Sequence, residues 1–307
     1  MVTIGIDTGN AQCKSSNFTI PSGIKEYQVK PASGDYLCEN GRYYVPTSDR
    51  LHYQEDKTVS REYWVLTNIL IVKELNRVHA YEKGMEIALS VGLPPEHMFN
   101  AEKIKAWGTY FKKNGKNVCI EYNGKTYEYT IKMVNVYPQG FAIVALNYAD
   151  FAKLSKAYIV DIGGYTVDIL TVKKAKLDPT NIASRDMGII TFYNEAISQV
   201  KKDTSRRVDE DDINDFLMNG KAGSKEVTES LKIAFDEYSR SLISFLNEMH
   251  IDIKHHNVTF MGGGSIYLRE RILAASEDNK NITFETDVNA NAKGFQKYME
   301  AALLKRG

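Results

Sequence analysis

The stretch from Ala157 to Lys176, AYIVDIGGYTVDILTVKKAK, constrains the fold more than any other part of the chain. Two apolar runs flank a short turn in which two glycines stand between two aspartates, a pattern that predicts a β-hairpin. The turn has two interpretations. Glycine, aspartate and threonine are ordinary turn residues. Alternatively, the bare backbone at Gly163 and Gly164 lets amide groups approach a phosphate. A second turn of the same design would favour the phosphate interpretation.

Such a turn lies near the start of the chain. The sequence IGIDTGNAQCK runs from an apolar strand through Asp7, Thr8, Gly9 and Asn10 into a second strand. Each of the two turns would place small residues and amide groups at the tip of a hairpin. Two such tips can clamp a polyphosphate while Asp7 and Asp161 hold Mg²⁺ through water.

A third glycine turn occurs in VTFMGGGSIYL, where Gly262, Gly263 and Gly264 follow a strand and open a helix. A run of three glycines can be a flexible loop. It can also be a place where a ligand approaches the backbone closely, because a strand-to-helix junction exposes amide groups. Each turn alone is weak evidence, but the three together indicate a nucleotide-binding protein.

Composition excludes several classes of protein. A chain of 307 residues predicts two domains, and its 39 basic and 39 acidic residues give no charge surplus that would favour nucleic acid. Three scattered cysteines predict neither a disulfide scaffold nor a zinc site. No signal peptide or membrane-length apolar run is present, so we expect a soluble, cytoplasmic protein. We interpret His255 and His256 as surface residues, because no ligand partner lies at suitable spacing.

Hydrophobic spacing predicts the elements around the turns. Asn123-Gly124 should form the tight turn of a hairpin, and Gly220 should end a helix. A buried strand is expected at residues 85–91 and a final strand at residues 282–284. Helices are expected over residues 61–81, 140–155, 224–249 and 290–305.

The three turns resemble those of the actin-type ATPases, which include actin, bacterial filament proteins, heat-shock chaperones and sugar kinases. DTGNAQCK resembles the first phosphate loop of that family, DIGGYTVD the second, and MGGGS the adenosine motif. VNVYPQGFAIVAL and DMGIITFYNEAI resemble the two connecting helices. Within the family, LSVGLPPEHM, YNGKTYEYTIKMVNVYPQG and NANAKGFQKYM resemble the plasmid-segregation actins of the ParM group.

The resemblance implies an α/β, two-lobed actin-like (ribonuclease H-like) ATPase fold with nucleotide in the interlobe cleft. Lobe I would span residues 1–154, with a C-terminal helix at 287–307 packing back on it, and lobe II would span residues 155–286. ATP would be the cofactor, with GTP as the alternative, together with Mg²⁺.

The resemblance also implies roles for individual residues. Gln139 and Asp161 would be catalytic, the first by positioning the attacking water and the second by polarising it. Asp7 and Asp161 would hold the metal through water. Asn10 stands where the family commonly has serine or threonine. The residues implied to bind the nucleotide are Asp7, Thr8, Gly9, Asn10, Lys14, Gly163, Gly164, Tyr165, Thr166, Gly188, Gly262, Gly263, Gly264 and Ser265.

By this resemblance the chain would hydrolyse ATP and assemble with copies of itself into dynamic filaments that segregate plasmid DNA. A DNA-binding adaptor would link filament and plasmid, with no direct contact to nucleic acid or membrane. The alternatives are a small-molecule kinase or phosphatase of the same fold, and a phage or chromosomal actin-like scaffold.

Overall fold

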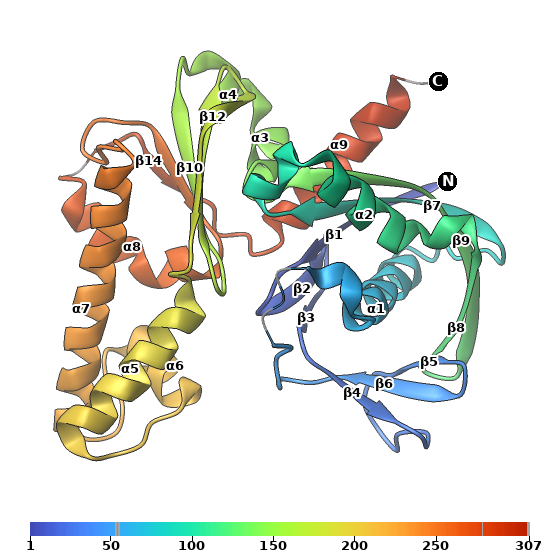
Figure 1. Ribbon diagram of the computed structural model, residues 1–307, viewed down its shortest axis with the longest axis horizontal. Coiled ribbons are helices and arrows are strands. Elements are labelled where there is room, and N and C mark those ends of the chain that lie inside the picture. Colours follow the sequence, from blue (N-terminus) through green and yellow to red (C-terminus); the bar gives the residue numbers. More distant parts are fainter. Residues whose placement is uncertain (53, 55, 278, 306–307) are drawn as a thin grey trace. The chain divides into compact units, whose positions relative to one another are not determined.

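The computed structural model of the chain describes residues 1–52, 54, 56–277 and 279–305. These residues form two compact units (Figure 1). The first unit contains Met1–Asp150 and the segment from Asn289 onward, and the second contains Phe151–Val288. Each unit is built on one β-sheet with helices packed against it, and each is described by itself below.

In the described part of the first unit, a nine-stranded sheet has the order β3-β2-β1-β7-β9-β8-β5-β6-β4. Strand β1 pairs antiparallel with β2 and parallel with β7, so its carboxyl end runs directly into the first predicted turn. The strands are β1 (Val2–Thr8), β2 (Gln12–Ser15), β3 (Thr19–Pro21), β4 (Ile24–Tyr27), β5 (Leu37–Glu39), β6 (Arg42–Pro46), β7 (Met85–Leu93), β8 (Asn117–Tyr122) and β9 (Lys125–Pro138).

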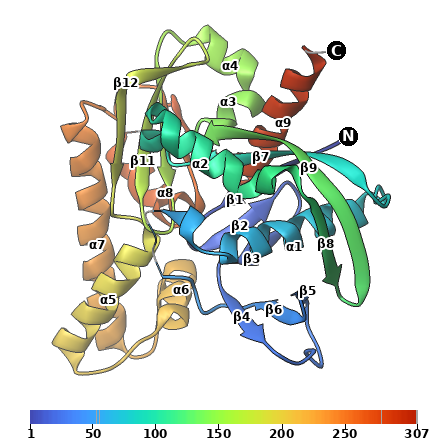
Figure 2. The ribbon, with the colours of Figure 1, turned by 45° about the vertical axis from the view of Figure 1, so that its right-hand side comes forward.

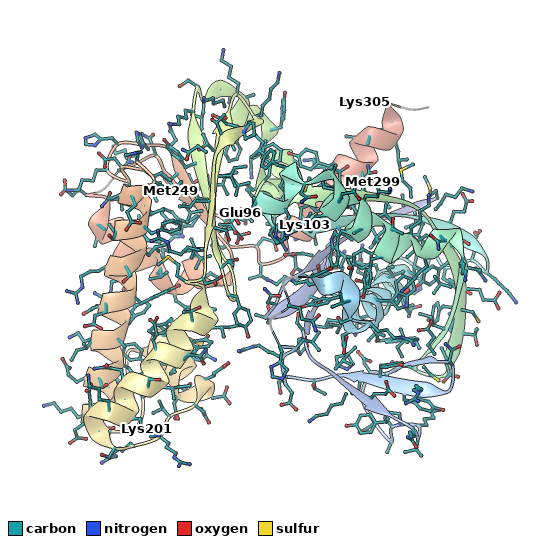
Figure 3. The ribbon with its side chains drawn as sticks, in the orientation of Figure 1. Glu96, Lys103, Lys201, Met249, Met299 and Lys305 are labelled. Atoms are coloured by element: carbon teal, nitrogen blue, oxygen red, sulfur yellow. The ribbon has the colours of Figure 1, made fainter. Side chains whose placement is uncertain are left out.

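Two helices cover opposite faces of β1. Ile4 belongs to the same buried cluster as Leu66 of α1. Gly5 points the other way, because successive residues of a strand face opposite sides. A Cβ atom at Gly5 would overlap the Ala292 carbonyl group of α9. Helix α9, which carries the fully buried Met299 (Figure 3), therefore packs directly on the backbone of β1.

The helices of the first unit are η1 (Lys57–Val59), α1 (Glu62–Arg77), η2 (Pro95–Phe99), α2 (Ala101–Lys112), η3 (Lys113–Gly115), α3 (Ala142–Leu146) and α9 (Ala290–Leu304). Helix α4 (Tyr148–Lys153) crosses from the first unit into the second.

The described part of the second unit contains a five-stranded sheet in the order β12-β11-β10-β13-β14, with helices packed beside it (Figure 2). All six residues of β10 are buried, as expected for the central strand of a covered sheet. The strands are β10 (Ala157–Ile162), β11 (Val167–Lys173), β12 (Lys176–Arg185), β13 (Val258–Met261) and β14 (Ile282–Phe284). The helices are α5 (Ile189–Thr204), α6 (Glu210–Asn219), α7 (Lys225–Glu248) and α8 (Gly263–Ala275).

Most of the predicted elements are present, with one clear difference. Asn123 and Gly124 join β8 to β9 with φ angles of 50° and 83°, which confirms the tight turn. The single helix expected over residues 140–155 is wrong, because α3 and α4 are separated at Asn147. Asn147 is the C-cap of α3, and its φ and ψ angles of −123° and 37° lie outside the helical range, so the helix cannot continue through it.

Candidate functional site

Asp7 lies at the end of β1, is 7% exposed and receives two side-chain amides. Gln139 Nε2 donates to Asp7 Oδ1 at 2.7 Å, and Asn291 Nδ2 lies 3.4 Å from Asp7 Oδ2. Asn291 Oδ1 in turn accepts from the backbone amide of Gly140 at 3.0 Å. Three distant segments thus meet at one carboxylate, and the two amides fix its orientation. Gln139 was expected near the reacting phosphate, whereas Asn291 was not among the predicted site residues.

The first turn follows Asp7 and connects β1 to β2. Asp7 and Lys14 are directly paired across these strands, so their side chains lie on the same face of the hairpin. A Cβ atom at Gly9 would lie 2.6 Å from the carbonyl oxygen of Gln12, which leaves space only for glycine. The hairpin therefore places a carboxylate and an ammonium group side by side, next to bare backbone.

Asn10 is held from outside the turn. The hydroxyl group of Tyr63, at the start of α1, donates to Asn10 Oδ1 at 3.3 Å. Tyr63 is 1% exposed, so this bond is made by a fully packed side chain. The first turn therefore carries an amide side chain that is bound to a buried tyrosine.

The second turn brings two carboxylates together. Asp161 and Asp168 are directly paired across β10 and β11, and they are 7% and 5% exposed. The Thr166 hydroxyl donates to Asp168 Oδ2 at 3.1 Å, and the Gly163 amide donates to the Thr166 carbonyl oxygen at 2.9 Å. Neighbouring carboxylates repel each other unless cations or donors lie near them. The Thr166 hydroxyl is such a donor for Asp168.

The described residues contain no cluster of three or more His, Cys, Asp or Glu side chains that could enclose a metal ion. Mg²⁺ keeps several waters and binds proteins through one or two carboxylates plus substrate phosphates. Asp7 in the first unit and Asp161 in the second are each buried beside a turn of bare backbone, and each by itself fits that mode of binding.

Gly188 lies directly behind the second turn. It is the N-cap of α5, and its backbone amide donates to the Tyr165 carbonyl oxygen at 2.8 Å. A Cβ atom at Gly188 would overlap the carbonyl group of Gly164. Gly188 therefore supports the backbone of the turn, and its lack of a side chain lets α5 approach.

The three glycines of the third turn differ in their surroundings. Gly262 has a φ angle of 83°, and a Cβ there would overlap the Asp161 carboxylate. A Cβ at Gly264 would overlap the Ile162 side chain, whereas a Cβ at Gly263 would have no atom within 4 Å. The Ser265 hydroxyl donates to the Gly262 carbonyl oxygen at 2.8 Å. Two glycines thus serve packing against β10, and Gly263 leaves open space beside the turn.

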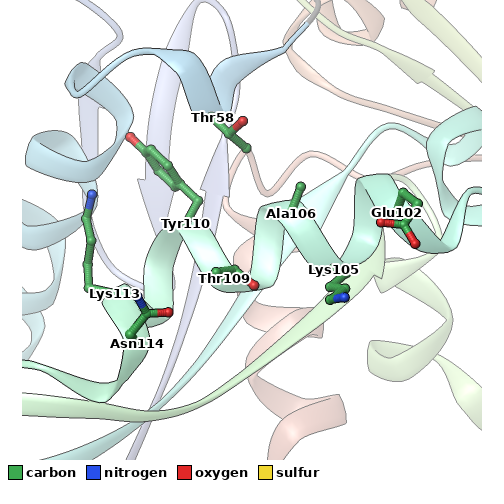
Figure 4. Close-up of a pocket in the computed structure, with 8 residues that line it drawn as sticks. All are labelled: Thr58, Glu102, Lys105, Ala106, Thr109, Tyr110, Lys113 and Asn114. Atoms are coloured by element: carbon green, nitrogen blue, oxygen red, sulfur yellow. The ribbon is translucent and has the colours of Figure 1, made fainter.

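A groove lies on α2 of the first unit (Figure 4). Its volume is about 440 Å³. Lys113 places its ammonium group 5.0 Å from the ring centroids of Trp64 and Tyr110, and burial lowers the pKa of Lys113. None of the predicted site residues lines the groove. The lining residues are Thr58, Glu102, Lys105, Ala106, Thr109, Tyr110, Lys113 and Asn114.

The described helices include none that is both long and apolar enough to cross a lipid bilayer.

No protein-family model matches the chain, and no curated protein does. Solved structures match it over nearly its whole length. The apo ParM protein of psk41 aligns with a TM-score of 0.72 at 17% identity, covering 99% of this chain and 98% of its own. The archaeal actin homologue Ta0583 in complex with ADP aligns with a TM-score of 0.75 at 16% identity, covering 98% and 100%. A ParM from a 15-stranded filament of Clostridium botulinum gives 0.75 at 17% identity, covering 98% and 100%.

The chain is therefore an α/β protein with the actin-like fold, built on two mixed sheets. The fold class implied by the resemblance to the actin-type ATPases is confirmed. Within that fold, the structures it matches include bacterial ParM proteins and an archaeal actin homologue.

Proposed function

We propose that the chain is an ATPase that assembles into nucleotide-dependent filaments. The observation that carries the proposal is the 2.7 Å hydrogen bond between Gln139 and Asp7. The residue expected to position the attacking water and the acidic residue of the first phosphate turn are in direct contact, although 132 positions separate them in the sequence. A structural turn would need neither a buried carboxylate nor an amide held against it.

Different residues would bind the phosphates, position the attacking water and accept a hydrogen bond from it. The turns at Gly9 and Gly163–Thr166 would bind phosphates through backbone amides, and Lys14 would add a positive charge. Gln139 would orient water, and Asp161 would accept a hydrogen bond from it. Mg²⁺ would supply charge neutralisation for the phosphates when bound. ATP binding would require the turns of both units.

The filament part of the proposal is supported by the actin-like fold and by the similarity to a ParM that forms a 15-stranded filament. We infer that ATP-bound copies of this chain polymerise and that hydrolysis weakens their contacts. The proposed role is plasmid segregation in the cytoplasm through a DNA-binding adaptor. The balanced charge of the chain gives no reason for a DNA template.

Sedimentation and light scattering with ATP and magnesium, in the absence of DNA, test the proposal. We expect pelleting that appears with ATP and fades as phosphate is released. Turnover that requires an added small-molecule acceptor, without pelleting, would replace the filament with a kinase. Pelleting that occurs only with DNA would indicate a nucleoprotein assembly instead.

A further inference from the structure

The two turns proposed to bind phosphate, at residues 7–10 and 161–166, are the first and second phosphate turns. Both must direct their backbone amides toward a phosphate. In a trans peptide the carbonyl group and the following amide point in opposite directions, and no cis peptide occurs among the described residues. A turn that offers amide groups to a phosphate must therefore have its carbonyl groups held on the opposite side. A buried carbonyl group left without a donor would cost free energy and would let the peptide rotate.

In the second turn, the start of a helix supplies donors to the carbonyl groups. The carbonyl oxygens of Gly163, Gly164 and Tyr165 accept hydrogen bonds at 3.1, 2.8 and 2.8 Å. The donors are the backbone amides of Ile189, Ile190 and Gly188, at the start of α5. These amides have no partner within their own helix, because the first turn of any helix leaves its N–H groups free. The amides of the second phosphate turn consequently point away from α5.

At the first turn, side chains supply the corresponding donors. Lys57 Nζ donates to the Thr8 carbonyl oxygen at 2.7 Å, and Ser22 Oγ donates to the Gly9 carbonyl oxygen at 2.5 Å. By the same peptide geometry, the amides of Gly9 and Asn10 point away from Lys57 and Ser22.

Several contacts hold Ser22 in this position. It is completely buried, and its own amide donates to the Ala11 carbonyl oxygen at 3.2 Å, so it contacts the turn twice. Its carbonyl oxygen accepts from the Leu51 amide at 2.8 Å, and the Cys13 sulfur lies 3.3 Å from its hydroxyl group. The hydroxyl group is thus fixed from several directions and has little freedom to turn away from Gly9.

We propose that Ser22, together with Lys57, is a positioning residue for the first phosphate turn. It aims the Gly9 and Asn10 amides at the phosphates, as the start of α5 does for the second turn. The inference rests on the proposed function, because it assumes that the turn binds nucleotide phosphates. Ser22 is the better residue to test, because the charge of Lys57 could attract a phosphate by itself.

The test compares Ser22→Ala with Ser22→Cys, a weaker donor of similar volume. Ser276→Ala is the matched control, because Ser276 is also completely buried and also donates to a backbone carbonyl, that of Leu273 at 2.8 Å. Calorimetry in reducing buffer with magnesium measures the dissociation constants for ATP and for AMP, which lacks the two outer phosphates.

We expect Ser22→Ala to weaken ATP binding about tenfold while AMP binding stays within about twofold, since one oriented hydrogen bond is at stake. Ser22→Cys should lie between Ser22→Ala and the wild type, and Ser276→Ala should change neither ligand. If Ser22→Ala does not fold, the selective loss in Ser22→Cys decides. An unchanged ATP affinity, or equal losses for ATP and AMP, would overturn the proposal. A wild type that does not bind ATP would overturn the proposed function, and this inference with it.

Discussion

The side-chain amide of Gln139 donates to Oδ1 of Asp7 at 2.7 Å. Asp7 is the last residue but one of strand β1, and Gln139 follows directly on β9. The backbone amide of Gln139 donates to the Leu93 carbonyl oxygen at 2.9 Å. This bond fixes the residue at the end of the sheet. A glutamine anchored in this way keeps its side chain beside the turn between β1 and β2.

Replacing this glutamine should separate hydrolysis from binding. In Gln139→Ala we expect phosphate release to slow by about a hundredfold or more, because positioning a nucleophile lowers the barrier by several kcal/mol. ATP binding and assembly should remain, and filaments should persist after those of the wild type have gone. Phosphate release recorded with light scattering over one ATP-limited time course measures both. Gln199→Ala is the control, because Gln199 also donates to an aspartate, Asp203, but does so on the exposed side of α5. Wild-type turnover in Gln139→Ala would remove Gln139 from catalysis.

Gly188→Ala should disable the second turn. The added methyl group would overlap the Gly164 carbonyl group, so either α5 or the turn must move. We expect a loss of about 1–3 kcal/mol in the free energy of unfolding and a much smaller melting shift with ATP. Gly108→Ala provides the contrast, because a Cβ there meets only a Val136 methyl carbon at 3.9 Å. That change should stabilise α2 by up to about 1 kcal/mol and leave the ATP shift intact. Equal ATP shifts in the two variants would contradict the role given to Gly188.

Glu74 is a buried carboxylate on α1 that binds the loop after β2. It accepts from the Ser15 hydroxyl at 2.7 Å, from the Asn17 amide at 2.8 Å and from the Asn17 side chain, and Arg77 Nε lies 3.2 Å away. Glu74→Ala should lower the free energy of unfolding by about 2–4 kcal/mol, because several buried donors lose their acceptor. Glu102→Ala, at an exposed position of α2, should change it by less than about 0.5 kcal/mol. Urea denaturation gives both values, and a loss below about 1 kcal/mol for Glu74→Ala would show that water replaces the carboxylate.

The cysteines should react at very different rates. Cys119 is exposed, Cys38 is partly exposed and Cys13 is buried. Burial raises the pKa of the Cys13 thiol to about 11, so almost none of it is the reactive thiolate at pH 8. A thiol reagent at pH 8 should therefore modify Cys119 first and Cys13 last, whereas in urea all three should react alike. Because the pKa of Cys13 is raised in the folded state, the thiol form favours folding, and this contribution is lost as the pH rises from about 9 to about 11. Early modification of Cys13 in the folded protein would show that the first hairpin opens.

Local sequence signals predicted much of the fold. The apolar spacing of residues 61–81 identified α1, and the Gly220 cap, with a φ angle of 72°, ended α6 where expected. The strand-turn-helix pattern around Gly262–Gly264 matches β13 and α8. These signals depend on periodicity and on backbone conformations that few residues adopt, so they can be identified in a single sequence.

The supports of the first turn could not be predicted in this way. Ser22 follows a proline in the sequence PSG and looks like an ordinary turn residue. Lys57 lies 49 positions from Thr8, and Asn291 lies 284 positions from Asp7. No local pattern connects such residues, because their contacts follow from how the strands and α9 pack. The break at Asn147 is similar, since the apolar spacing on either side continues across it.

Because a ribosome makes this chain from the N-terminus, α9 becomes available to the first unit only after the second unit has been made. Residues 151–288 are complete before any of α9 exists, so the second unit can fold while the first still waits for part of its own core. Until then the Gly5 face of β1 has no cover, and Asp7 lacks the Asn291 amide. Of the two units, the first is the one whose synthesis begins earlier and whose residues are completed later. A nascent chain therefore carries an incomplete first turn until α9 has been made and has packed on β1.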